Sequence, residues 1–242
     1  MRKVHFTLQG KGGVGKSWVS CQIAQYLMDR GGPVVCLDTD PVNATLSTHK
    51  ALCAEHVEMT DEASNTINTR AFDQVVERFL KEDSDFVLDN GASSFLPLSN
   101  YLIENPVFDM VAESGKATFL HTVITGGQAF DETVFGFGDL ANEMPETVGF
   151  IVWINEYFGR VEDSKGIPFE ETKAYLSNKH RVTGLVRLPR MTADTFGTDV
   201  KAMAERKWTY KEALDSPVFS LMARQRLKKV RQGVYDQLDK LI

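Results

Sequence analysis

The residues most able to do chemistry lie in the stretch QGKGGVGKSW, residues 9–18. Gly10, Gly15, Lys16 and Ser17 satisfy the spacing G-x-x-x-x-G-K-[ST], directly after an expected strand and at the start of an expected helix. In that setting, glycines let successive backbone N–H groups turn toward phosphate oxygens, and the helix N-terminus adds partial positive charge. We expect Lys16 to lie along the β- and γ-phosphates of a nucleotide and Ser17 to offer its hydroxyl to Mg²⁺.

Three aspartates at the ends of expected strands could complete this site. Asp38 and Asp40 lie in CLDTDPVNAT (36–45), and Asp89 ends the apolar stretch FVLD. Carboxylates at the C-terminal ends of parallel strands face the same crevice as the loop after the first strand. The sequence therefore predicts that the three carboxylates lie beside the phosphate loop.

The elements that would position these residues alternate along the chain. Apolar runs predict strands near residues 4–9, 34–38, 86–89, 118–125, 150–155 and 183–188. Amphipathic runs predict helices over 16–30, 71–81, 128–144, 169–178, 193–206 and about 217–241. This alternation is typical of an α/β fold with a mostly parallel, twisted sheet and helices on both faces. We expect one P-loop NTPase domain over residues 1–242, with segment 55–70 irregular.

Composition limits the classes of function. A net charge of −6 over 242 residues argues against a nucleic-acid-coating protein, although it permits a local basic patch. The three cysteines form no CxxC pair and the five histidines show no metal-ligand spacing, so we expect neither a disulfide framework nor a zinc site. No apolar run reaches the roughly 18 residues of a membrane span, and the first residues lack a signal-peptide core. We therefore expect a cytoplasmic protein without stable membrane insertion.

A second lysine, Lys11, makes the loop KGGVGKS, which resembles the deviant Walker A sequence of the ParA/MinD family of ATPases. The resemblance implies that Lys11 reaches across an ATP-dependent homodimer to the partner's nucleotide, so that hydrolysis depends on pairing. It also implies that Asp40, followed by Pro41, orients the attacking water, which would make Lys11, Lys16 and Asp40 the catalytic residues. A fixed cation beside charge that develops on the γ-phosphate lowers the barrier.

The same resemblance assigns the residues around the metal and the γ-phosphate. Asp38 and Asp89 would lie near Mg²⁺ together with Ser17, and Gly91 would present its backbone N–H to the γ-phosphate. The family usually has D-T-P or D-S-P at this position, whereas this chain has Asp89, Asn90 and Gly91. The phosphate-loop residues expected to bind ATP or ADP are Gly10, Lys11, Gly12, Gly13, Val14, Gly15, Lys16, Ser17 and Trp18.

The adenine contacts are assigned by resemblance alone. Asn155, at the end of FIVWIN, resembles an asparagine that reads adenine, and Pro189 in RLPR resembles a proline beside the base edge. A strand-end asparagine is equally a common turn former. The polar insertion 155–171 could cover the adenine through Tyr157 or Phe158, bind a partner through Arg160, or simply pack on the surface.

Five stretches, some of them beyond these motifs, together resemble the ParA-like proteins of conjugative plasmid transfer regions over essentially the full length. The stretches are LQGKGGVGKS, DTDPVNAT, DNGASSF, TGGQAF and RQRLKKVRQG. This closer resemblance implies a role in moving plasmid DNA between bacteria, with conjugative transfer or type IV secretion proteins as partners. Composition and spacing alone indicate no such role.

Five cations within eight residues mark the expected C-terminal helix: Arg224, Arg226, Lys228, Lys229 and Arg231. The helix could pack on the domain with its cations solvated, or contact DNA phosphates or an acidic protein. It could also lie on a membrane, but its apolar stripe has no Trp or Phe.

Two classes of function follow from these observations. In the first, the chain is a slow ATPase, with or without stimulation by a partner, and ATP favours a dimer that hydrolysis releases. In the second, a bound nucleotide only stabilises an interaction module that works through the basic helix or the 155–171 loop. A metabolic kinase fits the fold, but the paired-lysine loop disfavours it.

Overall fold

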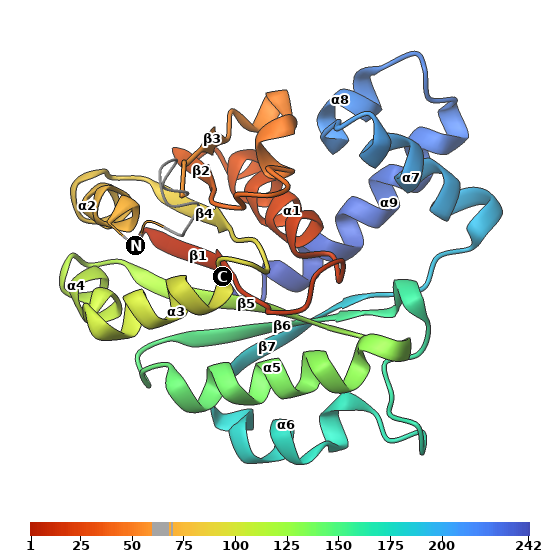
Figure 1. The fold of residues 1–242 in the computed structure, drawn as a ribbon. Helices are drawn as coiled ribbons and strands as arrows, with labels where there is room; N and C mark the ends of the chain where they lie inside the picture. Colours follow the sequence, from red (N-terminus) through yellow and green to blue (C-terminus); the bar gives the residue numbers. More distant parts are fainter. Residues whose placement is uncertain (60–67, 69) are drawn as a thin grey trace.

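Seven parallel strands form one sheet in the computed structural model, which describes residues 1–59, 68 and 70–242 (Figure 1). The strand order is β3-β2-β4-β1-β5-β6-β7, so the loop after β1 lies near the middle of the carboxyl edge. The strands are β1 (Lys3–Thr7), β2 (Val34–Asp38), β3 (Glu55–His56), β4 (Asp85–Asp89), β5 (Ala117–Thr125), β6 (Gly149–Asn155) and β7 (Val182–Leu188).

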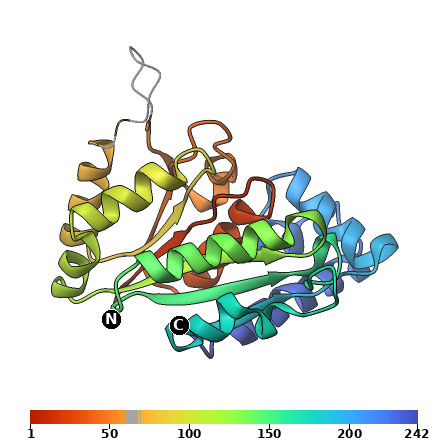
Figure 2. The same ribbon diagram turned by 60° about the horizontal axis from the view of Figure 1, so that its bottom comes forward.

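Helices cover both faces of the sheet, because successive strand residues point to opposite faces. On β1, Val4 and Phe6 belong to the core beneath α2 to α5, whereas Thr7 accepts a hydrogen bond from Ser20 of α1. One face carries α1 (Lys16–Asp29) and α9 (Leu221–Leu238). The other carries α2 (Ala71–Lys81), α3 (Phe95–Glu104), α4 (Val107–Glu113), α5 (Phe130–Glu143) and α6 (Lys173–Asn178). Both ribbon views place α5 and α6 side by side (Figures 1 and 2).

The predicted α/β class, with a parallel sheet and helices on both faces, is confirmed. The structure adds α3 and α4, which the sequence analysis missed because Pro97 and Pro106 interrupt the apolar pattern. Pro97 is tolerated because it lies in the first turn of α3, where the missing N–H costs little.

Differences also occur in the segments expected to be irregular or to form long helices. Residues 55–56 of the supposedly irregular segment form β3, while residues 60–67 and 69 lie outside the described residues. The helix expected over 193–206 is a π-helical turn (Ala193–Gly197) followed by α7 (Thr198–Glu205). The C-terminal helix begins only at Leu221, after the separate α8 (Tyr210–Asp215), and a small core joins α7, α8 and the start of α9.

A buried polar chain crosses the sheet beneath α1. Trp153 Nε1 donates to His121 Nδ1 at 2.9 Å, so His121 carries its proton on Nε2, which lies 2.9 Å from His5 Nδ1. His5 therefore carries its proton on Nε2, a buried atom without a hydrogen-bond partner among the described residues. Burial lowers the pKa of His5 to about 3 and that of His121 well below its ordinary value. Both imidazoles are neutral at neutral pH.

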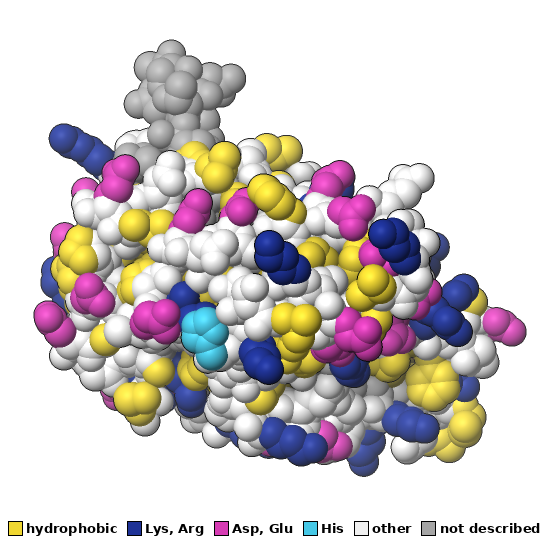
Figure 3. Space-filling view, turned by 90° about the horizontal axis from the view of Figure 1, so that it is seen from below, with side chains coloured by type: hydrophobic (Ala, Val, Ile, Leu, Met, Phe, Trp, Pro, Cys, Tyr) yellow, Lys and Arg dark blue, Asp and Glu magenta, His cyan; other side chains and the backbone are white. Residues whose placement is uncertain are grey.

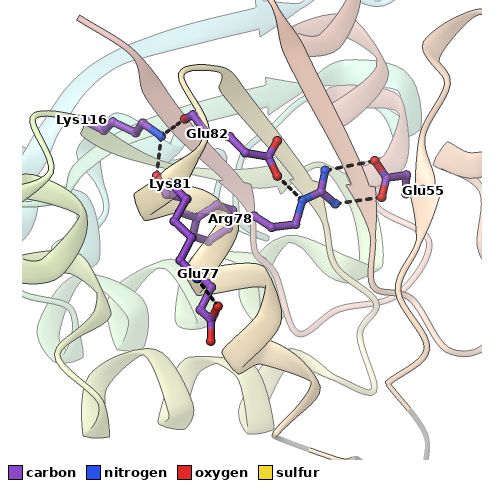
Figure 4. Close-up of polar contacts among 7 residues, drawn as sticks. Glu55, Glu77, Arg78, Lys81, Glu82 and Lys116 are labelled. Atoms are coloured by element: carbon purple, nitrogen blue, oxygen red, sulfur yellow. Dashed lines mark hydrogen bonds and ion pairs between the residues drawn. The ribbon is translucent and has the colours of Figure 1, made fainter.

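The end of α2 is held by a buried cation (Figure 4). Lys116 Nζ donates to the carbonyl oxygens of Phe79 and Glu82 at the C-terminal end of α2, where helix carbonyls lack intrahelical partners. Burial lowers the pKa of this ammonium. Arg78 contacts the carboxylates of both Glu82 and Glu55, and this joins α2 to β3.

Candidate functional site

The loop between β1 and α1 has the backbone of a phosphate-binding loop. Gly13 and Gly15 adopt left-handed φ angles of 75° and 103°, and Gly15 directly precedes α1. A side chain at Gly15 would also meet the Asn155 amide, 3.1 Å from where its Cβ would stand. Other residues rarely adopt such angles, so the glycines let the loop curl around an anion at the helix N-terminus. The exposed glycines of the loop are Gly10, Gly12 and Gly13.

Lys16 lies inside this loop. Its Nζ donates to the backbone carbonyl of Lys11 at 3.0 Å, and its side chain is buried. Burial lowers the pKa of the ammonium, while the charges of Asp89 and Asp40 raise it. Trp18, in the first turn of α1, packs against the small core of α7 to α9 and so connects the loop to that part of the chain.

The expected carboxylates lie at the same edge of the sheet. Asp38 and Asp89 are paired across β2 and β4, and Asp89 is also paired with Thr7, the last residue of β1. Asp89 Oδ1 accepts a hydrogen bond from Ser20 at 2.8 Å, whereas its buried Oδ2 has no hydrogen-bond partner among the described residues. Burial raises the pKa of Asp89 to about 7, although the neighbouring hydroxyls of Ser17 and Ser20 act against that shift.

The second strand's aspartates organise the loop that follows it. Asp38 accepts backbone N–H groups through both oxygens, from Asp40 at 3.2 Å and from Ser47 at 2.9 Å. Asp40 Oδ1 accepts the N–H groups of Val42 and Asn43 at 2.9 and 3.0 Å. Burial raises the pKa of Asp38, and its backbone hydrogen bonds lower it. Asp38 therefore shapes the 40–47 loop, a structural role that the spacing had not indicated.

Two loops of the site are joined by a buried network. Thr39 Oγ1 donates to Asn90 Oδ1 at 3.1 Å, and Ser94 Oγ donates to the same oxygen at 2.8 Å. Next to this network, a Cβ on Gly91 would stand 2.5 Å from Asp40 Oδ1. This chain has Asn90 and Gly91 where the resembled family usually has Thr or Ser followed by Pro. Asn90 provides the amide of the network, and Gly91 has no side chain to clash with Asp40.

The structure places Lys11 against an acidic residue that the sequence analysis did not single out. Lys11 Nζ lies 2.7 Å from Oε2 of Glu132, in the first turn of α5. Gln9, just before the loop, is buried, and its amide donates to Thr122 Oγ1 at 3.3 Å and to the Thr133 carbonyl at 3.2 Å. The only sequence signal for Glu132 and Thr133 is their place after the fourth predicted strand.

Asn155 contacts the phosphate loop itself. Its Nδ2 donates to the Val14 carbonyl at 2.9 Å, and its Oδ1 accepts the Tyr157 N–H at 3.1 Å. The β6–β7 pairing sets Asn155 beside Leu188, and the exposed Pro189 follows at the same edge. Asn155 and Pro189, the two residues expected to contact adenine, are therefore neighbours, and Asn155 also supports the phosphate loop.

The turn after β5 and the 155–171 loop fit closely together. A Cβ on Gly126 would collide with the backbone carbonyl of Arg160, and Gly127 has a left-handed φ of 74°. Tyr157 and Phe158 are exposed and pack edge to face on one another, with ring centroids 4.9 Å apart. The TGGQ stretch thus has a packing reason for its glycines.

Four of the five α9 cations have partners within the chain, because Lys229 also lies over the ring of Phe196, 5.9 Å from its centroid. Arg226 donates to Asp199 at 2.5 Å, Arg231 lies 3.6 Å from Asp29, and Arg224 donates to a backbone carbonyl of α8 at 3.4 Å. The exposed members of the set are Lys228 and Lys229. On the face seen from below, acidic and basic side chains are interspersed (Figure 3). Packing on the domain is the interpretation that these contacts support.

Two features are absent from the described residues. None of their helices combines the length and the apolar character needed to cross a membrane. They contain no cluster of three or more His, Cys, Asp or Glu side chains able to hold a metal ion.

Known proteins resemble this chain over most of its length. Residues 6–229 match the model of the CobQ/CobB/MinD/ParA nucleotide binding domain. A relative from Escherichia coli called Protein TraL is 46% identical over 239 residues, covering 99% of this chain and 98% of the relative.

Two solved structures share the fold at low sequence identity. A ParA family ATPase from Chlorobium tepidum TLS has a TM-score of 0.52 at 12% identity, covering 95% of this chain and 97% of the other. The septum site-determining protein MinD from Pyrococcus horikoshii OT3, complexed with Mg-ADP, has a TM-score of 0.50 at 18% identity. That match covers 99% of this chain and 98% of the other.

Proposed function

Because this chain belongs to the CobQ/CobB/MinD/ParA nucleotide-binding domain family, we propose that it binds Mg·ATP and acts as a dimerisation switch in conjugative plasmid transfer. The observation that carries the proposal is the phosphate loop with two lysines, Lys11 and Lys16, at the same edge of the sheet as the carboxylates that end or follow β2 and β4. The 46% identity to TraL supports the part that concerns transfer, with transfer or type IV secretion proteins as partners.

The residues of the site fit a magnesium ion. Asp89 Oδ2 is buried without a hydrogen-bond partner among the described residues, which is costly unless a ligand completes its surroundings. Ser17 is close enough to Asp89 to affect its pKa. Ser17 would hold the ion directly and Asp89 through a water molecule, with Asp38 behind them. When bound, Mg²⁺ would neutralise charge on the β- and γ-phosphates.

The chain's own residues would do the remaining work. The loop N–H groups and the start of α1 would bind the phosphates, and Lys16 would exchange the Lys11 carbonyl for phosphate oxygens. Asp40 would orient the attacking water, and the Gly91 N–H would meet the γ-phosphate. Since Asp40 and Gly91 are in contact, a change at the γ-phosphate would move both loops together.

The proposal is tested by light scattering across protein concentrations with ATP or ADP. Wild type should form dimers with ATP, and its ATPase activity per subunit should rise with concentration. Lys11→Ala should keep its nucleotide affinity and lose assembly. A tightly retained nucleotide, with no turnover and no ATP-dependent dimer, would instead favour the nucleotide-stabilised interaction module.

A further inference from the structure

Lys11 is held within its own subunit. Its Nζ lies 2.7 Å from Glu132 Oε2, and the two side chains are 38% and 58% exposed. The pair therefore lies at the surface beside the phosphate loop, where a second subunit could approach it. Lys11 cannot extend into another subunit until this contact opens.

A buried amide fixes the backbones of this pair relative to one another. Gln9 Nε2 donates to the carbonyl of Thr133, the residue after Glu132, at 3.2 Å, and its Oε1 accepts the Lys11 N–H at 3.5 Å. Gln9 is only 1% exposed. A Cβ on Gly136 would stand 2.5 Å from Gln9 Oε1, so α5 approaches the loop closely only because this residue is glycine. The position of Glu132 beside Lys11 thus follows from the packing of α5.

Asp131, in the same turn of α5, is a natural comparison for Glu132. Asp131 has the same charge and is exposed, but its side chain makes no ion pair or hydrogen bond within the described part of the chain. Both acidic residues favour the start of α5 through the helix dipole. Only Glu132 also contacts Lys11, so the two roles can be separated by experiment.

We propose that Glu132 is a positioning residue that holds Lys11 in cis until ATP is bound and a second subunit arrives. This role rests on the proposed dimerisation switch. In the dimer, Lys11 would exchange one carboxylate for the more highly charged triphosphate of the partner. The cis contact must break before Lys11 can reach a second subunit. Glu132 would therefore oppose dimerisation when the partner subunit has no γ-phosphate for Lys11 to contact.

The test compares Glu132→Gln with the matched control Asp131→Asn by sedimentation across protein concentrations with Mg·ATP. We expect Glu132→Gln to lower the dimer dissociation constant about two- to fivefold, the size of a half-exposed ion pair, and Asp131→Asn to leave it unchanged. In a Lys11→Met background, Glu132→Gln should have no further effect, because the interaction is already lost. Equal effects of the two variants, or weaker dimers with Glu132→Gln, would overturn the proposal.

A second measurement needs no dimer. Acylation of Lys11 by a limiting N-hydroxysuccinimide ester, followed by peptide mass spectrometry, should rise in Glu132→Gln and not in Asp131→Asn. Unchanged labelling would overturn the cis contact itself. Labelling as expected, together with no ATP-dependent dimers in wild type, would instead overturn the proposed switch and with it this role for Glu132.

Discussion

The carboxylate of Asp40 lies directly against the backbone of Gly91, since a Cβ on Gly91 would stand 2.5 Å from Asp40 Oδ1. The two residues follow different strands, β2 and β4, and Asp38 and Asp89 pair those strands at their carboxyl ends. The contact joins the residue proposed to orient water to the N–H proposed to meet the γ-phosphate. Its geometry should therefore matter for turnover more than for nucleotide affinity.

Replacing Gly91 by alanine should displace the Asp40 carboxylate. We expect ATP hydrolysis to fall by about 10²-fold, the cost of a misplaced catalytic group, while ATP affinity changes little. Release of phosphate and binding of a fluorescent ATP analogue would measure the two effects. Gly138→Ala is the control, because a Cβ there would meet Ala174 at an ordinary 3.6 Å. Normal turnover in Asp40→Ala would remove Asp40 from its assigned role.

Removing the buried ammonium of Lys16 should abolish useful nucleotide binding. Loss of a buried charged partner costs about 2 kcal/mol or more, so Lys16→Ala should weaken ATP binding at least about 30-fold. Isothermal titration calorimetry with ATP would measure this change. Lys11→Ala should retain near wild-type affinity in the same titration, and a comparable loss there would contradict the separation of the two lysines.

Asp89→Asn should uncouple nucleotide binding from magnesium. The variant removes the negative charge but keeps an oxygen that can accept the Ser20 hydrogen bond. With Mg²⁺ present, ATP affinity should fall by about 10- to 100-fold, as for other residues that support a metal site. Titrations in Mg²⁺ and in EDTA provide the comparison. Equal Mg²⁺ dependence in the variant and wild type would exclude Asp89 from the metal site.

Acidification should destabilise the protein through His5 and His121. Their pKa values are lowered by burial, that of His5 to about 3, so the unfolded chain binds more protons than the folded one below pH 6.5. Stability is then retained above pH 6.5 and lost as the pH falls toward the folded-state values. At pH 5 the loss from His5 should be about 2 kcal/mol.

Urea unfolding at pH 7.5 and pH 5 would measure this effect. His5→Leu removes one of the imidazoles that bind a proton in the unfolded chain, and His5 Nε2 has no hydrogen-bond partner among the described residues. The variant should lose less stability between the two pH values than wild type does. The surface variant His180→Leu, at a position outside this buried chain, should keep the wild-type difference. An unchanged difference in His5→Leu would contradict the assignment.

Lys116→Met should destabilise the fold without affecting ATP binding. The change leaves the carbonyls of Phe79 and Glu82 without the ammonium and should cost about 1–3 kcal/mol of the free energy of unfolding. Lys81→Met is the control, because Lys81 pairs with Glu77 at the exposed surface (Figure 4). That pair should contribute about 0.5 kcal/mol or less. Similar losses in both variants would show that burial of Lys116 is unimportant.

Local patterns predicted much of the fold and the centre of the candidate site. Strand periodicity indicated that Asp38 and Asp89 end strands at the same edge of the sheet, and the glycine spacing indicated the loop before Lys16. Such features depend on residues close together in the chain. The same periodicity missed α3 and α4, because a proline at or just before the start of a helix is indistinguishable from a helix breaker in sequence.

Contacts between distant segments could not be predicted in this way. The position of Glu132 beside Lys11 depends on how α5 packs against Gln9, which no local pattern encodes. Likewise, the basic run of α9 left open whether its cations are solvated or bind a partner, whereas Arg226 and Arg231 have acidic partners 27 and more than 200 positions away in the chain. A run of like charges in the sequence does not show whether its side chains are exposed, because that depends on their neighbours in the folded chain.

The close fit between Gly126 and the Arg160 carbonyl constrains how this chain can evolve. A larger residue at position 126 would clash unless the turn after β6 changed its conformation. A longer turn there would leave room for a side chain at position 126. Among homologous genes, the two segments should therefore be inherited as a matched pair. A mutation that separates them would survive only with its compensating change.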